Sequence, residues 1–345
     1  MLSTPLRKID VGSYGIYNLS GTYYKEENDY VLGIVSSRAY LYSLKYDDEL
    51  FKIYTHDQPA DVSYNDTMKA FGFVDYEGRV YLLYLDDFYE HVFEYEIRRV
   101  NYDFENYYSF MDEYHDLTNE ARVIETGHHA KTIKMVNDGF MLCSNVNGTC
   151  GFFDYYGDKL WEVEVGGEVI KRPAYWYGYW FIPDVSNDRV LVVNKYGKIL
   201  GSIDFERFSN VYHVDVCERY LAVATKYYLY VFKLPKPSFI DENGWIYAGP
   251  YSSKGDKIPL RIRWENEVNY PSEVAFTHDC RYLVVGEREG QAVKVFDNSN
   301  GELVDEREFD SEVLSVATWR ESYEFNDSIV AVGLANRYVY MYQLT

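Results

Sequence analysis

Two stretches of the sequence decide the fold: Phe152-Phe153-Asp154-Tyr155-Tyr156-Gly157-Asp158-Lys159-Leu160 and Val192-Val193-Asn194-Lys195-Tyr196-Gly197-Lys198-Ile199-Leu200. Their Tyr, Gly and Leu residues coincide when residue 154 is aligned with residue 194, an offset of 40 residues. Each stretch is typical of a strand, a tight turn at glycine and a second strand. Repetition with a period of this length indicates an array of similar structural units.

The same strand end recurs along the whole chain. Four of the six intervals between successive occurrences lie between 39 and 46 residues, and the other two measure 69 and 64 residues. The long intervals exceed the regular one by roughly 25 to 30 residues, which predicts an insertion in each of them. The seven positions are Leu44, Leu85, Asp154, Asn194, Lys233, Asp297 and Gln343.

The third unit shows the strand pattern most clearly. It has strand-forming stretches at 131–136, 140–144, 149–155 and 160–165, separated by turn residues. Asn147-Gly148, between the second and third stretches, is a strong hairpin signal because both residues tolerate positive φ. Four antiparallel strands in about 40 residues form the blade of a β-propeller.

The sixth unit resembles a WD repeat. Its stretch 273–286 continues into Val293-Lys294-Val295-Phe296-Asp297 and Asn300-Gly301-Glu302-Leu303-Val304, with Phe296-Asp297 where that family often has Trp-Asp. Gly127-His128, ahead of the third unit, resembles the Gly-His dipeptide of the same family. The resemblance implies a propeller of divergent repeats, since other residues occupy the aspartate position elsewhere: Leu44, Leu85, Lys233 and Gln343.

The repeats add up to seven blades. Their spans are 14–55, 56–126, 127–165, 166–205, 206–265, 266–310 and 311–345. The last unit has only three predicted strands, at 314–319, 329–333 and 338–344. The stretch 6–11 supplies the missing fourth strand, and its pairing with 338–344 closes the ring without an open edge. We therefore predict an all-β fold, one seven-bladed β-propeller domain over residues 1–345.

The first insertion, near 86–120, is both acidic and aromatic. We expect a short helix over 104–111. One interpretation is a partner-binding protrusion, because long loops on rigid scaffolds often carry function. The other is a loop that packs its aromatic side chains on the outer edge of the blade. The candidate contacts are Phe104, Tyr107 and Tyr108.

The second insertion, near 235–257, is rich in Pro and Gly and is predicted to be an irregular loop. Its aromatic residues form either an exposed binding patch or a small satellite core. The candidate binding residues are Trp245 and Tyr247.

Several cationic and aromatic residues fall on or beside predicted innermost strands, which line the central channel. In an acidic chain they suggest an anionic ligand or an acidic peptide at the channel mouth. The alternative interpretation is local charge balance with neighbouring carboxylates. These candidate binding residues are Lys134, Lys171, Arg172, Trp176 and His213.

The chain has 345 residues, 38 of them Tyr, and a formal net charge of −21. Tyr favours strands. The negative charge disfavours binding to nucleic acid or to anionic membranes, and favours a protein partner with a basic surface. We find no apolar run of about 18 residues and no apolar leader, so we expect a soluble protein without membrane spans or signal peptide. The expected location is cytoplasmic, with a virion-associated location as the alternative.

The four cysteines are too few for a disulfide-built scaffold. Cys143 and Cys150 flank the Asn147-Gly148 turn and sit opposite each other if the turn is centred at 146–147. That geometry permits a disulfide, whereas reduced, buried thiols are the usual outcome in a cytosol. The sequence leaves both states open for this pair.

Familiar catalytic motifs are not found in the sequence. It has no P-loop, no dinucleotide fingerprint, no Gly-x-Ser-x-Gly and no His-Glu-x-x-His. We therefore expect a non-catalytic scaffold that binds proteins through a propeller face and its inserted loops, without cofactor or metal. The alternatives are a hydrolase, lactonase or glycosidase with its site at the channel mouth, or a structural component of a viral or archaeal assembly. The sequence does not fix an oligomeric state.

Overall fold

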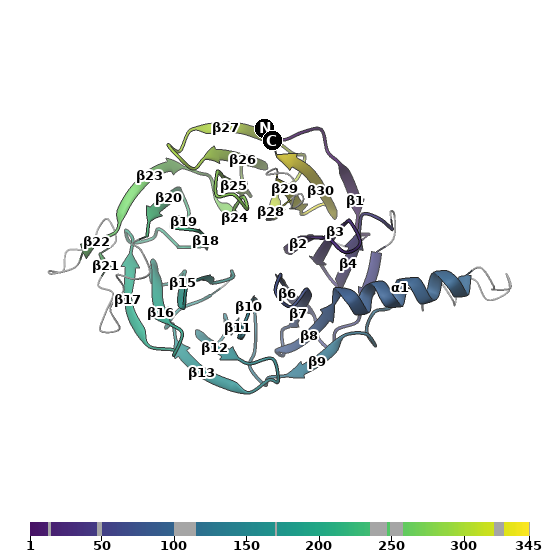
Figure 1. Cartoon of the computed structure of the whole chain (residues 1–345). Helices are drawn as coiled ribbons and strands as arrows, with labels where there is room; N and C mark the ends of the chain where they lie inside the picture. Colours follow the sequence, from purple (N-terminus) through teal and green to yellow (C-terminus); the bar gives the residue numbers. More distant parts are fainter. Residues whose placement is uncertain are drawn as a thin grey trace.

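The computed structural model describes residues 1–12, 15–46, 50–99, 115–169, 171–234, 247–248, 258–320 and 328–344. Seven four-stranded antiparallel sheets stand around one central axis like the blades of a propeller (Figure 1). This confirms the predicted all-β, seven-bladed β-propeller. The seven predicted units coincide with the seven sheets, except that the fifth sheet extends two residues further, to Glu267.

The blades follow one another in chain order, and the first strand of each sheet is the innermost one (Figure 1). Blade 1 contains β2 (Asn18–Tyr24), β3 (Asp29–Val35), β4 (Ala39–Ser43) and β5 (Leu50–Ile53), and blade 2 contains β6 (Pro59–Asn65), β7 (Ala70–Asp75), β8 (Arg79–Tyr84) and β9 (Arg122–Glu125). Blade 3 contains β10 (Thr132–Val136), β11 (Gly139–Cys143), β12 (Thr149–Phe153) and β13 (Lys159–Glu164). Blade 4 contains β14 (Ala174–Trp176), β15 (Tyr179–Asp184), β16 (Arg189–Asn194) and β17 (Ile199–Asp204). Blade 5 contains β18 (His213–Cys217), β19 (Tyr220–Ala224), β20 (Tyr228–Lys233) and β23 (Arg261–Glu267), and blade 6 contains β24 (Pro271–Phe276), β25 (Tyr282–Glu287), β26 (Ala292–Asp297) and β27 (Leu303–Glu308). Blade 7 contains β28 (Val313–Arg320), β29 (Ser328–Leu334), β30 (Tyr338–Leu344) and, as its outer strand, β1 (Arg7–Asp10).

The ring is closed by the two ends of the chain. β1 pairs antiparallel with β30, with Arg7 opposite Met341 and Asp10 opposite Tyr338. A further bridge joins Leu2 to Leu344, and the two termini lie side by side in Figure 1. The predicted pairing of 6–11 with 338–344 is therefore confirmed.

Middle and outer strands differ in burial because adjacent blades pack face to face. All seven residues of β29 are buried, and so are all five of β4. The outer strand β13 alternates instead, with Val163 buried between exposed neighbours. The sequence follows this arrangement, since middle strands are continuous apolar runs while outer strands carry charge on one face.

Glycines in second strands allow the next blade to approach closely. Gly33, Gly72, Gly286 and Gly333 each lie opposite a residue of the first strand of their own blade. A Cβ at Gly286 would lie 2.7 Å from Val313 Cγ1 and 3.0 Å from Val316 Cγ1, both in the neighbouring blade. Gly33, Gly72 and Gly286 thus leave room for the first strand of the following blade, and Gly333 leaves room for Ile16, which lies just ahead of β2.

The first insertion contains a helix, α1 (Leu85–Arg99), that begins where β8 ends and extends outward from the rim of the ring (Figure 1). Its apolar residues recur at helical spacing, with Leu85, Phe88, Tyr89 and Val92 all buried. The helix predicted from the sequence, over 104–111, lies outside the described residues. α1 was not predicted, because Leu85 also fits the end of a strand.

The chain that returns from α1 covers the outer edge of blade 1. Lys52 of β5 donates its N–H to the carbonyl of His115 at 2.6 Å, and Leu117 donates to the carbonyl of Lys52 at 2.8 Å. Because a free strand edge can pair with another chain, this segment protects the part of β5 that it covers. In the second insertion β21 (Tyr247–Ala248) lies beside β17 and pairs with β22 (Ile258–Pro259), which directly follows the predicted insertion.

Two disulfides are present in the structure. Cys143 and Cys150 lie directly opposite each other on β11 and β12, which confirms the predicted register of this hairpin. The bond between Cys217 and Cys280 was not anticipated, because it joins blade 5 to blade 6 across 63 residues of sequence. In a chain-entropy model a loop of that length stabilises the folded state by roughly 4 kcal/mol.

Filling the space at Gly286 is expected to destabilise the ring. Gly286→Val would push branched carbons against two valines and Ser272 in a packed interface, and overpacking of this kind costs about 1–3 kcal/mol. The matched control is Glu308→Val, which adds valine at an exposed position on the outer strand of the same blade. Urea unfolding measures both; equal stability of the two variants would contradict the close approach.

Candidate functional site

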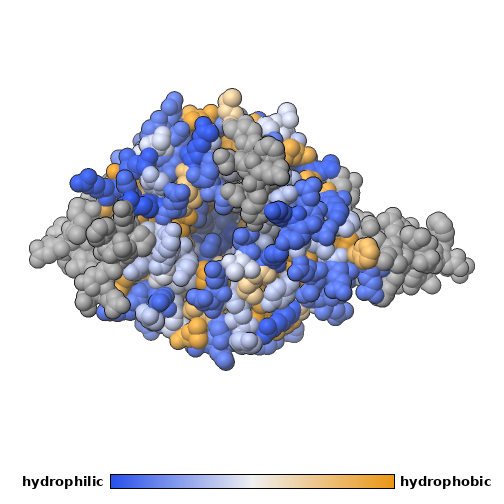
Figure 2. All heavy atoms as spheres, viewed as in Figure 1, coloured by the Kyte–Doolittle hydropathy of each residue, from blue (hydrophilic) through white to orange (hydrophobic). Residues whose placement is uncertain are grey.

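The candidate site is the central channel, where four of the five residues predicted at the channel mouth come together. Lys134 lies on β10 and His213 on β18. Lys171 and Arg172 are separated by Pro173 from β14, whose three residues make it the shortest innermost strand of the ring. In Figure 2 the centre of the ring is a hollow surrounded by hydrophilic residues.

Arg172 bridges the channel from blade 4. Its Nη2 donates to Glu273 Oε1 of blade 6 at 2.6 Å and to the carbonyl of Leu19 of blade 1 at 3.0 Å. Its Nη1 donates to the carbonyl of Val62 of blade 2 at 3.3 Å, and its Nε lies 3.5 Å from Asp61 Oδ1. One guanidinium therefore links four of the seven blades.

Lys171 makes a second set of contacts across the axis. Its Nζ donates to Asn18 Oδ1 of blade 1 and to the carbonyl of Leu314 of blade 7, both at 3.4 Å. It also lies 3.8 Å from Glu273 Oε2. The cations of blade 4 thus lie against strands that are distant in sequence.

Three carboxylates that were not predicted from the sequence complete the cluster: Asp61, Asp215 and Glu273. Each one accepts an N–H from the innermost strand of the following blade. Asp61 Oδ2 accepts from Ile133 at 2.9 Å, Asp215 Oδ2 from Phe276 at 2.8 Å, and Glu273 Oε2 from Val316 at 3.2 Å.

A sequence signal for these carboxylates existed. Each lies in or beside an apolar stretch at the start of a unit, as in Ala60-Asp61-Val62 and Val214-Asp215-Val216. First strands pair on one side only, so their outward N–H groups need acceptors when buried. An acidic residue on a predicted innermost strand could therefore have been assigned as such an acceptor.

Burial shapes the titration of the cluster. It raises the pKa of the Asp61 and Asp215 carboxyls and lowers the pKa of the Lys134 and Lys171 ammonium groups. Burial also opposes the charge of Arg172, but the carboxylates of Asp61, Glu273 and Asp215 outweigh it and raise the pKa of Arg172. The guanidinium is thus the fixed charge around which the cluster is organised.

His213 is held neutral within the cluster. Burial, together with the charges of Lys171, Arg172 and Lys134, lowers its pKa well below the ordinary value of 6.5. Its Nδ1 accepts the N–H of Val274 at 3.3 Å, so in the neutral ring the proton is assigned to Nε2. Nε2 lies 3.5 Å from Glu273 Oε1. His213 therefore acts as another acceptor between blades 5 and 6.

The charges of this cluster balance. Lys134, Lys171 and Arg172 face Asp61, Asp215 and Glu273, three cations against three carboxylates. This favours the interpretation of local charge balance. Binding of an anionic ligand at the channel mouth stays a prediction. Two hollows lie along the axis: one of about 330 Å³ beside Arg172, and one of about 380 Å³ beside Lys171, Tyr17 and Tyr270.

The remaining predicted residues lie elsewhere. Trp176 is buried between blades 4 and 5, where its indole N–H donates to the carbonyl of Glu218, so the structure does not place it in the channel cluster. Tyr247 belongs to β21 at the rim, and its side chain is not described. The other candidates of the insertions lie outside the described residues: Phe104, Tyr107, Tyr108 and Trp245.

Within the described ranges, no group of three or more His, Cys, Asp or Glu residues is arranged to hold a metal ion. In the same part of the chain, no helix has the length and apolarity needed to cross a membrane. Comparison with known proteins gives no matching family model and no matching curated protein. The similarity to WD repeats therefore stays a resemblance, carried by the motifs of units three and six.

The low pKa of His213 predicts a pH dependence of folding. Above pH 6.5 His213 is neutral in both states; below it the unfolded chain binds a proton that the folded chain does not, so stability falls. One pH unit below 6.5 this loss amounts to about 1.4 kcal/mol.

The variant His213→Asn should lack that loss while its amide oxygen still accepts the Val274 N–H. Urea unfolding on both sides of pH 6.5 measures the difference, with the exposed His56→Asn as control. The same pH dependence in His213→Asn and in the unmodified protein would contradict the assignment.

Proposed function

We propose that this protein is a non-catalytic scaffold that binds a protein partner with a basic surface, through α1 and the adjoining rim of the ring. The observation that carries the proposal is a helix whose first turns are fixed in the core of the ring while its remainder projects outward (Figure 1). Long elements held by rigid scaffolds are common places for binding.

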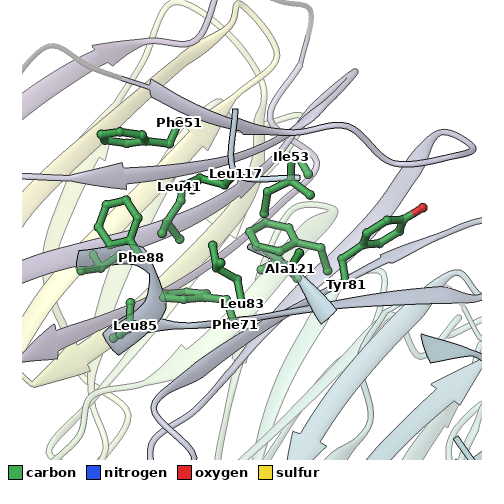
Figure 3. Packing of buried hydrophobic residues seen from close by; sticks show 14 of the residues in the cluster. Leu41, Phe51, Ile53, Phe71, Tyr81, Leu83, Leu85, Phe88, Leu117 and Ala121 are labelled. Carbon is green, nitrogen blue, oxygen red and sulfur yellow. The ribbon is translucent and has the colours of Figure 1, made fainter. Parts of the chain in front are cut away.

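The root of α1 is firmly packed. Figure 3 shows Phe88 and Leu85 among residues of blades 1 and 2. The rings of Phe88 and Phe51 meet edge to face with their centroids 5.0 Å apart, and Leu117 is fully buried beside them. His91 Nδ1 lies 3.0 Å from Glu120 Oε1, which ties the helix to the returning chain. A projection with such a root presents its exposed face in a fixed orientation, which lowers the entropy cost of binding.

Charge supports a basic partner. The protein carries a formal net charge of −21, and α1 begins with exposed Asp86 and Asp87. Burial and the carboxylates of Asp86, Glu120 and Glu90 raise the pKa of Asp87, a sign of concentrated negative charge at the root of the helix. Complementary charge steers association and selects partners.

The contacts in the channel support a scaffold over an enzyme. The ionisable side chains there bind to one another and to backbone groups of neighbouring blades. Breaking a buried ion pair by removing one partner costs about 3–5 kcal/mol, so these groups serve the ring itself.

The test compares the partners recovered by the full chain and by a variant in which a Gly-Ser linker replaces residues 94–114. This variant keeps the buried root of α1, so we expect unchanged thermal stability and loss of the main partner in cross-linking and affinity recovery. The control replaces the exposed turn residues Val146-Asn147 by Gly-Ser and keeps Gly148, whose backbone has positive φ. Recovery of the same proteins by all three forms would overturn the proposal.

A further inference from the structure

The space between α1 and blade 1 forms a groove of about 560 Å³. One wall is the face of α1 that carries Asp86, Tyr89, Glu90 and Phe93, which follow one another at helical spacing. The other wall belongs to blade 1, from the turn between β2 and β3 and from the end of β4. The groove therefore lies at the root of the proposed binding projection.

Aromatic rings form the base of the groove. Tyr24 and Tyr89 stack with their centroids 5.3 Å apart, and Tyr46 meets Tyr89 at 6.3 Å. Tyr89 donates to Asp29 Oδ2 at 2.6 Å, and Tyr24 donates to Asp86. Because these hydroxyls are engaged with carboxylates, the rings are held in place before any ligand arrives.

Carboxylates surround the rings. Glu26, Glu27, Asp86 and Glu90 line the groove, and among its described lining residues Lys45 is the one cation. Glu27 pairs with Lys45 at 2.7 Å and Glu26 with Lys69. No ion pair to Glu90 occurs within the described part of the chain. Among the residues that the structure describes, the exposed carboxylate of Glu90 thus has no counter-charge beside the rings.

The lysines of the protein itself show what the groove accommodates. Lys45 Nζ lies 5.5 Å from the centroid of the Tyr46 ring and 6.0 Å from that of Tyr89. Lys69 Nζ lies 5.4 Å from the centroid of the Tyr24 ring. An ammonium within about 6 Å of a ring face is attracted by its quadrupole, and a carboxylate nearby adds an ion pair. Intramolecular ammonium groups already occupy two sides of this base.

We propose that the groove binds a lysine or arginine side chain from a basic, extended segment of the partner, with its alkyl part against Phe93 and its charge between Glu90 and the tyrosine rings. Phe93 is 64% exposed, although it is apolar and lies next to the buried Val92. The long stems of Lys and Arg cover such apolar surface while their charged ends reach carboxylates. This inference rests on the proposed scaffold function and names the chemistry that the partner must present.

The experiment uses the full chain and a fluorescent Gly-Ser peptide carrying several lysines, with binding followed by anisotropy at low salt. The test variant is Glu90→Gln/Phe93→Ala, whose two side chains are exposed. The control is Leu160→Ala/Glu164→Gln, which removes one carboxylate charge and shortens one exposed apolar side chain on β13. It loses the same charge, so it corrects for general attraction to an acidic protein.

We expect the test variant to bind the lysine peptide about tenfold more weakly than the unmodified protein, and the control variant to bind it equally well. A peptide with acetylated lysines should not bind, because it lacks the charge. Equal affinity of the test and control variants, or equal binding of the acetylated peptide, would overturn this inference.

The two proposals fail separately. Loss of the partner on replacement of 94–114, combined with unchanged peptide affinity in the groove variant, would leave the scaffold function standing and remove the groove. The reverse pattern, with a weakened peptide and an unchanged partner, would support the groove as a binding site and remove the part of α1 beyond Phe93 as the route to the partner.

Discussion

The pairing of β1 with β30 is the constraint on which the rest of the structure depends. Seven sheets of this kind cannot bury both faces unless each has a neighbour on either side, and only a closed circle provides that for all seven. The last blade has three strands of its own, so the first residues of the chain must complete it. Leu2, Ile9 and Val11 are buried there. Burial of three such side chains contributes on the order of 5 kcal/mol.

Closure also brings the innermost strands together around the axis, where backbone groups need partners. Side chains of one blade accept the N–H groups of the next, through Ser20, Asp61, Ser63, His213, Asp215 and Glu273. Three of these acceptors are carboxylates, and burying them requires cations. Blade 4, with the shortest inner strand, supplies Lys171 and Arg172. Closure of the ring therefore accounts for the channel cluster without requiring a bound ligand.

The sequence was sufficient for the number of blades and for the latch, because both follow from local patterns. Strand alternation, glycine turns such as Gly157 and Gly197, and an unfinished last unit are all visible in one chain. It was also sufficient for the cations of the channel, which stand at the starts of units. These features depend on residues close together in sequence or on a regular period.

Contacts between blades could not be predicted in the same way. Arg172 meets Glu273 across 101 positions of sequence, and Cys217 meets Cys280 across 63. Such pairs depend on the radial position of each side chain, which repeat spacing does not contain. α1 was missed for another reason: its pattern of Leu85, Phe88, Tyr89 and Val92 begins at a residue that also fits the end of a strand. Trp176 shows the converse, because it belongs to the inner strand β14 and yet its side chain packs in the interface between blades 4 and 5.

The most direct test of ring closure is urea unfolding of a chain that lacks residues 1–11, with and without a synthetic peptide of those residues. Closure by β1 predicts that the shortened chain loses several kcal/mol, on the order of the 5 kcal/mol of buried apolar surface, and that the peptide restores stability in proportion to its concentration. A shortened chain as stable as the full one, indifferent to the peptide, would contradict it.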